Sequence, residues 1–430
     1  MVIVFVLVAL AVLAAVAGLH WYVWRRLVRD TTAAPGTPRR VGTAVFAAGP
    51  VLMVAALVAE RAGAPFWLQR TLGWPGFLWM ALSLYLLLAV LAGEVVRPLL
   101  RKLLERRTRP EPPAVPVPAL AGAPTGAPTG VPANTPQPQQ APATEPRPEP
   151  RPEPAPPSRR LFVSRVVGGA AATAAVATVG YGTYGVLRGP RVKRVTVPLA
   201  KLPRSADGYR IAVVSDIHLG PVLGRGFAQQ VVDTINATQP DLIAVVGDLV
   251  DGSVKDLGPA AAPLAQLSAR HGAYFVTGNH EYFSGAEQWV EEVRRLGLHP
   301  LENARTELPG FDLAGVNDVQ GESEGHGPDF ERALGDRDTA RACVLLAHQP
   351  VQIHDAVRHG VDLQLSGHTH GGQLWPGNFL AAAANPTVAG LERYGDTQLY
   401  VSRGAGAWGP PTRVGAPSDI TVIELRSTRA

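Results

Sequence analysis

The stretch DLQLSGHTHG occupies residues 362–371 and joins a short apolar run to two histidines flanked by glycines. Two imidazoles one residue apart on such a loop can face two adjacent metal ions. Similar side chains occur in SDIHLG at 215–220, GDLVD at 247–251, GNHEY at 278–282 and AHQP at 347–350. Their carboxylate, amide and imidazole groups suit a pair of divalent transition-metal ions rather than a thiolate zinc site.

From about residue 211 onward, short apolar runs alternate with helix-like stretches. The candidate strands are IAVVSD, DLIAVVGD, AYFVTGN, FDLAGV, CVLLAH, DLQLSGH, LYVSRG and ITVIEL. Residues 226–239 and 286–296 have the amphipathic pattern of helices. Several of the strands are continuously apolar, as expected where both faces of a sheet are covered, so the pattern predicts a layered α/β domain. The polar motifs follow the strand ends, where α/β sheets place ligand sites.

The order of the motifs DxH, GD, GNHE, H and GHxH across residues 206–426 resembles the calcineurin-like metallophosphoesterases. The tail VSRGAGAWGPPTRVGAPSDITVIEL is similar to that of bacterial membrane-associated phosphohydrolases in this superfamily. The resemblance implies a two-sheet αββα sandwich that hydrolyses a phosphate monoester or diester. It also implies two divalent cations with a bridging hydroxide as the nucleophile. Imidazole, carboxylate and amide ligands accept manganese, iron, cobalt or zinc, so the ligands leave the identity of the metal open.

The resemblance assigns roles to seven metal ligands and to one further histidine. The first metal would be held by Asp216, His218 and His370, the second by Asn279, His348 and His368, and both by Asp248.

His280 would lie near the phosphate, where it stabilises the transition state or protonates the leaving oxygen; a structural histidine is the competing interpretation. We expect Glu281 and Tyr282 to orient the loop. Arg403 could reach the substrate phosphate or form a salt bridge within a turn. An apolar pocket or the core could hold Trp375, Phe379 and Trp408.

The composition indicates a chain that is partly in lipid, since 46% of its residues are hydrophobic and only 17% are charged. Residues 1–199 contain 22 Lys and Arg against 8 Asp and Glu, a net charge of +14. Residues 200–430 contain 18 against 27, a net charge of −9. An acidic C-terminal half argues against a nucleic-acid partner. Cys343 is the single cysteine, so no internal disulfide can form, and we expect it in the core.

Four uncharged runs, at 2–24, 41–59, 71–93 and 166–187, are long enough to cross a bilayer. Clusters of arginine follow the first and third runs, whereas the loop after the second has only Arg61 and Arg70. The positive-inside rule then predicts a multi-pass protein of the cell membrane with an extracytoplasmic catalytic domain. Against this orientation stand the basic residues that follow the fourth run, Arg188, Arg191, Lys193 and Arg194.

The chain is therefore predicted to have four parts. Residues 1–109 form a three-span module, and residues 110–157, with 18 of the 40 prolines, form a disordered linker. Residues 158–190 form a fourth span whose Arg159 and Arg160 resemble a twin-arginine export signal, although an ordinary span with basic flanks is the alternative. Residues 200–430 form the phosphoesterase domain.

Three hypotheses for function follow from this sequence. The main one is a membrane-anchored, metal-dependent phosphoesterase with the bilayer as its partner and a lipid-linked or envelope phosphate ester as a candidate substrate. The second is a phosphatase for phosphoproteins or soluble nucleotides. The third is a non-catalytic, metal-stabilised binding domain, which the complete set of ligands opposes.

Overall fold

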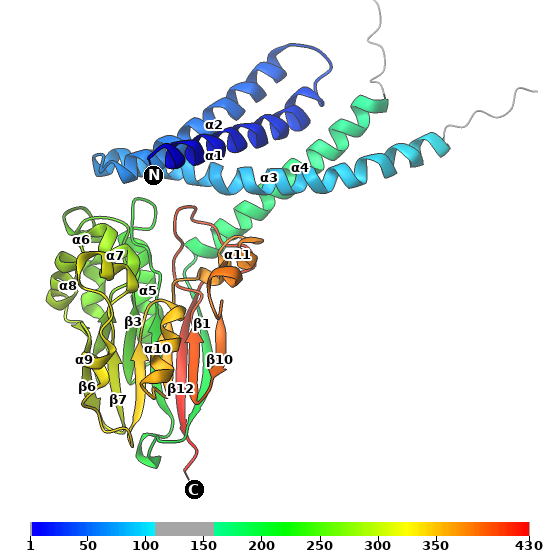
Figure 1. The fold of residues 1–430 in the computed structure, drawn as a ribbon. Coiled ribbons are helices and arrows are strands. Elements are labelled where there is room, and N and C mark those ends of the chain that lie inside the picture. Colours follow the sequence, from blue (N-terminus) through cyan, green and yellow to red (C-terminus); the bar gives the residue numbers. More distant parts are fainter. Residues whose placement is uncertain (1, 108–158, 430) are drawn as a thin grey trace, which may run out of the picture.

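The chain folds into a module of long helices and a β-sandwich, and the helices lie across one end of the sandwich (Figure 1). The computed structural model describes residues 2–107 and 159–429. The predicted linker at 110–157 lies outside the described residues. The first described part ends with α3 and the second begins with α4, and these two helices pack together in the helical module (Figure 1).

The helical module contains α1 (Val2–Trp24), α2 (Thr37–Arg61), α3 (Phe66–Arg107) and α4 (Arg159–Leu187), with a short π-helix at Arg25–Arg29. Among the residues that the structure describes, three segments are long and apolar enough to cross a membrane, at Thr37–Arg61, Phe66–Leu103 and Arg159–Leu187, and α1 is not one of them. The helix α1 has the bounds of the first predicted run. The helix α3 continues well past the predicted run at 71–93, and Glu94 in its extension forms ion pairs with Arg26 and Arg97.

Small side chains form the contact between α3 and α4. Ala171 and Ala175, one turn apart on α4, are buried together with Ala81 of α3. Small residues at such positions let two helix backbones approach closely, and this packing is the main source of helix association where no hydrophobic driving force exists.

The sandwich consists of two six-stranded sheets. The first has the order β1 (Arg191–Leu199), β12 (Asp419–Ser427), β2 (Tyr209–Val214), β3 (Leu242–Val246), β4 (Ala273–Val276) and β5 (His299–Pro300). The second has the order β10 (Gly390–Tyr394), β11 (Thr397–Val401), β9 (Leu363–Ser366), β8 (Ala342–Leu346), β7 (Phe311–Gly315) and β6 (Ala304–Leu308). All eight predicted strands are present, and so is the predicted two-sheet sandwich.

The sheet begins before the predicted start of the domain at residue 200. The strand β1 lies parallel to β12 in an unbroken register that pairs Arg191 with Asp419 and Leu199 with Ser427. The first sheet therefore begins at Arg191, four residues after α4 ends at Leu187. This short connection leaves little freedom between the last helix and the first sheet.

Along a strand, alternate side chains point to opposite faces of the sheet. One set fills the space between the two sheets, and the other set packs under the helices. Ile211 and Val213 of β2 point into the core shared with the second sheet. Ala212 and Val214 point to the opposite face, which α5 (Arg225–Ala237) and α8 (Ala286–Arg295) cover. The outer face of the second sheet, where Cys343 is buried as expected, is covered by α9 (Phe330–Leu334) and α10 (Ile353–Arg358). Covering on both faces explains the continuously apolar strands.

The end of the sandwich nearest the helical module carries α6 (Val254–Ala261), α7 (Asn279–Ser284) and α11 (Gly377–Ala384) (Figure 1). Short 3₁₀ turns complete the connections at Arg204–Ala206, Ala262–Gln266, Val319–Glu324, Pro350–Gln352 and His370–Gly372.

Two loops at this end of the sandwich are packed into the helical module. Leu374 and Val414 contact the buried cluster between α3 and α4. The hydroxyl of Tyr85 on α3 donates a hydrogen bond of 2.9 Å to the carbonyl of Trp375. Gly182 on α4 lies so close to the second loop that an added Cβ would sit 2.7 Å from the carbonyl oxygen of Arg413. The helices and the sandwich therefore form one packed unit.

Candidate metal centre

Five of the seven predicted metal ligands have an unusual backbone conformation. Among the described residues, eight that are not glycine have a positive φ, and five of them are the predicted ligands Asp216, His218, Asp248, His368 and His370, with φ between 48° and 71°. Such residues are uncommon, cost free energy, and cluster at functional sites. Each lies in a loop that directly follows a strand, so the tight loops hold the side chains at the end of the sheets.

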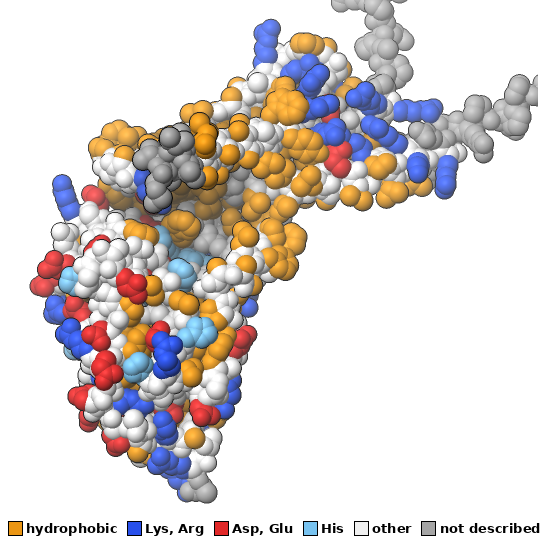
Figure 2. All heavy atoms as spheres, viewed as in Figure 1, with side chains coloured by type: hydrophobic (Ala, Val, Ile, Leu, Met, Phe, Trp, Pro, Cys, Tyr) orange, Lys and Arg blue, Asp and Glu red, His pale blue; other side chains and the backbone are white. Residues whose placement is uncertain are grey.

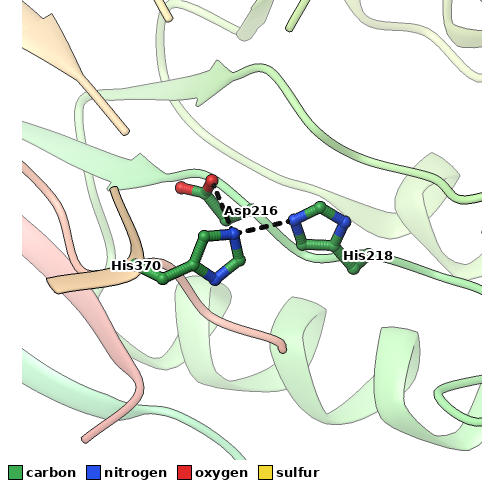
Figure 3. Close-up of side chains that lie close together, drawn as sticks. All are labelled: Asp216, His218 and His370. Carbon is green, nitrogen blue, oxygen red and sulfur yellow. Dashed lines mark hydrogen bonds and ion pairs between the residues drawn. The ribbon is translucent and has the colours of Figure 1, made fainter. Parts of the chain in front are cut away.

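Three of the predicted ligands meet in a first group (Figure 3). Nε2 of His370 lies 3.0 Å from Nε2 of His218 and 3.4 Å from Oδ1 of Asp216. The side chain of His218 is fully buried, and so is that of Asp216. Burial holds the pKa of His370 well below its ordinary value, so its imidazole is neutral and has a lone pair to offer a cation.

The remaining predicted ligands meet in a second group. Nε2 of His348 lies 3.1 Å from Oδ2 of Asp248, and Nδ1 of His368 lies 3.0 Å from Oδ1 of Asn279. The ring of His368 lies edge-on to that of His348, with 5.3 Å between their centres. Burial, aided by the charge of His348, lowers the pKa of His368 to about 4. This imidazole is therefore also neutral near pH 7.

Asp248 lies between the two groups, as its predicted bridging role requires. The oxygen that contacts His348 is also 3.8 Å from Nε2 of His218 in the first group. Metal ions fit this arrangement on two observations. The Nε2 atoms of His218 and His370 face each other, and the ligand atoms lie within 4.8 Å of one another both for Asp216, His218 and His370 and for Asp248, His348 and His368.

Comparison with known proteins supports this chemistry. The family model described as calcineurin-like phosphoesterase matches residues 209–372. A metallophosphoesterase of Helicobacter pylori is 37% identical over 256 residues, which cover 58% of this chain and 68% of that protein. A metallophosphoesterase of Bacillus subtilis is 31% identical over 286 residues, which cover 63% of this chain and 98% of that protein. The chain belongs to the calcineurin-like phosphoesterase family. Divalent metals are the cofactors of this family.

Relatives in animals share the combination of helices and a phosphoesterase domain. The zebrafish (Danio rerio) protein named "transmembrane protein with metallophosphoesterase domain" is 41% identical over 260 residues. The match covers 57% of this phosphoesterase and 60% of the zebrafish protein. This chain therefore spans about three fifths of the length of the curated relatives of this kind. Together with the three apolar helices, the likeness supports association with a membrane.

His280 of the phosphoesterase lies beside both groups without joining either. Its backbone N–H donates to Oδ1 of Asp248 at 2.9 Å, and its ring centre is 4.7 Å from that of His218. Two aromatic rings, those of Phe283 and Trp408, contact its other sides with 5.5 and 5.6 Å between ring centres. His280 is thus the histidine between the metal groups and the outer aromatic residues.

The sequence interpretation missed Asp251, the second aspartate of GDLVD. Its Oδ1 accepts hydrogen bonds from Nδ1 of His218 at 2.8 Å and from Nδ1 of His280 at 2.7 Å. Burial would raise the pKa of Asp251, but the two histidines outweigh burial and lower it to about 2. The carboxylate is therefore charged and orients both rings. The signal was available, because an aspartate three residues after Asp248 falls on the same loop.

The expected loop-orienting role fits Glu281. Its buried carboxylate accepts hydrogen bonds from the backbone N–H groups of Asp248, Leu249 and Gly278, at 2.9, 2.7 and 2.6 Å. It thereby joins the loop that follows β3 to the loop that follows β4. Tyr282, the other expected orienting residue, donates its hydroxyl proton to the carbonyl of His326 at 3.1 Å and fastens a third loop.

Arg413 was also missed, because it is distant in sequence from the ligand that it contacts. Its guanidinium donates to the carbonyls of His370, Gly406 and Ala416 at 3.0, 2.6 and 3.2 Å. The Nη2 atom lies 3.2 Å from Nδ1 of His370. Arg413 therefore fixes both the backbone and the ring of a predicted ligand. No local sequence motif predicts a buried arginine in this role.

The remaining sequence candidates lie around the mouth of the site. Arg403 packs against Gly371, next to His370, and no carboxylate lies within 4.0 Å of its guanidinium in the part of the chain that the structure describes. The alternative of a salt bridge is therefore not seen. The aromatic candidates are not core residues, since half or more of the surface is exposed for Trp375, Phe379 and Trp408.

Proposed function

We propose that this protein is a membrane-anchored, metal-dependent phosphoesterase that hydrolyses a lipid-linked phosphate ester. The observation that carries the proposal is the short link between the site and the helices. His370 belongs to the first metal group, and Leu374, four residues later, contacts the buried cluster of α3 and α4. A site joined to apolar helices in this way opens beside the bilayer, where lipid substrates are held.

We assign the metals as the motifs suggest. Asp216, His218 and His370 would hold one ion, Asn279, His348 and His368 would hold the other, and Asp248 would serve as a ligand shared by the two. When bound, two divalent cations neutralise phosphate oxygens and acidify a water for attack on phosphorus. The neutral carbonyl of Asn279 limits the negative charge of the site, so that an anionic ester can enter. Arg403, free of a carboxylate partner, is a candidate to bind a phosphate oxygen.

His280 serves as the proton donor to the leaving oxygen. Asp251 accepts the hydrogen bond from Nδ1 of His280, which leaves the Nε2 proton for the substrate. Burial lowers the pKa of His280, but Asp251 outweighs burial and raises it to about 9. The histidine is then protonated near neutral pH, as a general acid must be before it donates.

The apolar mouth of the site favours a substrate with an acyl or isoprenoid chain. Phe283, Trp408 and Trp375 expose 64%, 50% and 50% of their surface, and Phe379 and Leu380 of α11 expose 66% and 77%. Figure 2 shows a hollow between the helices and the sandwich, bordered by hydrophobic side chains. Exposed apolar groups of this extent mark contact with a ligand or membrane. Phosphoproteins and soluble nucleotides, the alternative substrates, lack a long apolar chain that could contact these exposed side chains.

The orientation follows from the charges. Lys and Arg gather at the end of the helical module that lies farthest from the sandwich (Figure 2). This end includes Arg26, Arg29 and Arg39 around the start of α2, and Arg97 and Arg101 on α3. Under the positive-inside rule this end is cytoplasmic, which supports an extracytoplasmic sandwich in a multi-pass protein. The use of Arg159 and Arg160 as an export signal stays a prediction.

The experiment uses the full chain in lipid nanodiscs, stripped of metal with a chelator and resupplied with manganese, iron, cobalt or zinc. Hydrolysis of p-nitrophenyl phosphate and of bis-p-nitrophenyl phosphate identifies monoester or diester chemistry. Phosphatidic acid in the nanodisc is then compared with soluble glycerol 3-phosphate and with a phosphopeptide. We expect metal-dependent turnover and a preference for the membrane-held ester.

The variant Asp248→Asn tests the metal assignment. Loss of the shared carboxylate should lower turnover by about a thousand-fold, since metal ions lower the activation barrier by several kcal/mol. The matched control is Asp233→Asn, an exposed aspartate on α5. Normal turnover in Asp248→Asn would refute the two-metal assignment. A folded, metal-loaded protein without activity on any ester would favour the binding-domain alternative.

A further inference from the structure

A cavity of about 550 Å³ lies between α4 and the loop at 413–418, and none of the predicted metal ligands lines it. The α4 side contributes Tyr181, Tyr184 and Arg188, and Arg191 follows at the start of β1. Arg413 and Ser418 line the side of the loop. Arg413 separates this cavity from the metal centre, because its guanidinium is bound to the backbone of His370.

Among the described residues, two of the arginines that line the cavity lack an acidic partner, and its buried serine hydroxyl lacks a hydrogen-bond partner. In the described ranges, 2–107 and 159–429, neither Arg188 nor Arg191 has a carboxylate within 4.0 Å, and both side chains are exposed. Ser418 is only 5% exposed, yet its hydroxyl oxygen is buried without a hydrogen-bond partner. Buried polar groups in native proteins are almost always satisfied, so the free hydroxyl indicates a ligand with a hydrogen-bonding group.

The cavity lies at the depth of a membrane surface. It borders the last three turns of α4, a helix long and apolar enough to span a bilayer. Tyr181 and Tyr184 are 74% and 61% exposed there, and the guanidinium of Arg188 lies 5.8 Å from the ring centre of Tyr184. Exposed tyrosines at a helix end are typical of the zone of lipid headgroups.

Arg188 and Arg191 also conflict with the charge rule that orients the helices. They follow α4 on the side that carries the sandwich, where the positive-inside rule disfavours basic residues. A specific role for their charge would explain this position. Their setting beside tyrosine rings, Ala177 and Pro417 offers both a cationic and an apolar surface to one ligand.

We propose that this cavity binds the phosphate headgroup of an anionic phospholipid from the leaflet next to the sandwich. Arg188 and Arg191 pair with the phosphate, and the Ser418 hydroxyl donates to one of its oxygens. The tyrosine rings and Val414 contact the glycerol and the first part of the acyl chains. Free phosphate would gain from the arginines and the Ser418 hydroxyl but would leave the apolar lining unused.

The experiment measures lipid binding to the full chain in detergent micelles by native mass spectrometry. Phosphatidylglycerol is titrated against phosphatidylcholine, and catalysis plays no part in the readout. We expect a bound phosphatidylglycerol in the native protein. The double variant Arg188→Gln, Arg191→Gln should bind it about 30-fold more weakly, since each basic residue near a membrane surface contributes on the order of 1 kcal/mol.

Two further variants keep the result interpretable. Arg188→Lys with Arg191→Lys retains the charges and should stay within a few-fold of the native affinity. Arg194→Gln with Arg204→Gln removes the same charge from exposed positions outside the cavity and should have no effect. An equal loss in this control would show diffuse attraction and overturn the proposal. Displacement of the lipid by an equal concentration of inorganic phosphate would also overturn it.

Discussion

Nδ1 of His280 lies 2.7 Å from Oδ1 of Asp251, and the same carboxylate oxygen lies 2.8 Å from Nδ1 of His218. One buried carboxylate thus orients both the proposed proton donor and a proposed metal ligand. Asp251 is not one of the seven predicted metal ligands. The chemistry of this phosphoesterase therefore depends on a residue outside that set.

The variant Asp251→Asn should move the pH dependence of turnover. Asp251 outweighs burial and raises the pKa of His280 to about 9, so His280 stays protonated at neutral pH and loses its proton only near pH 9. Without the charge, the pKa should fall toward the ordinary value of about 6.5, and the alkaline limb of kcat should move down with it. The control is Asp233→Asn. An unchanged profile at a lower rate would mean that Asp251 only supports the structure.

The variant Arg413→Gln should weaken metal binding at the group that contains His370. The guanidinium holds the backbone of His370 from behind, and loss of such outer contacts typically costs 10–100-fold in metal affinity. Competition between the full chain and a manganese chelator measures this directly. Arg341→Gln, which affects the ion pair with Asp312 at the start of β8, is the control. Native affinity in Arg413→Gln would exclude a positioning role.

The variant Glu281→Gln should lower the melting temperature of the full chain by several degrees. Glu281 accepts three backbone N–H groups, and the amide has only one accepting oxygen, so at least one buried N–H loses its partner at a cost of about 1–3 kcal/mol. Thermal unfolding in nanodiscs provides the measurement. The exposed Glu307 gives the control Glu307→Gln. Equal melting temperatures would show that the loops do not need this carboxylate.

The double variant Phe379→Ser, Leu380→Ser should separate the two substrate classes. Both side chains are exposed on α11, so the fold should tolerate the change. We expect a lower kcat/KM for membrane-held phosphatidic acid and an unchanged value for p-nitrophenyl phosphate. Val351→Ser, at an exposed apolar residue in a turn away from α11, should leave both values unchanged. Equal losses on both substrates would argue against a lipid-binding role for α11.

The strands that the sequence did not reveal are β1, β5, β6 and β10, and these are the four edges of the two sheets. An edge strand is paired on one side only and keeps polar side chains that discourage aggregation. The strand β10 has the sequence GLERY and β6 has ARTEL, without the apolar run that marks a central strand. The central strands were predictable because both of their faces are buried.

The metal groups were predictable because each ligand lies in a short motif directly after a strand. Asp251 and Arg413 differ in kind, since they act on ligands through contacts that only the fold creates. Arg413 reaches His370 across 43 positions of the chain, and Asp251 reaches His280 across 29. Motif spacing places Asp251 on the loop of Asp248. Neither spacing nor periodicity shows that Asp251 contacts His280 or that Arg413 contacts His370.

The hydrogen bond from Tyr85 to Trp375 and the seating of Leu374 and Val414 among the helices have a consequence for substrate reach. Under the proposed function, the loop of His370 is packed against helices that cross the bilayer, so the fold, rather than a flexible tether, sets the height of the metal groups above the lipid headgroups. A phosphate held at that height is accessible, whereas one raised on a long polar spacer is not. The length of a lipid's polar head, as well as its chemistry, would then decide which esters this protein can cleave.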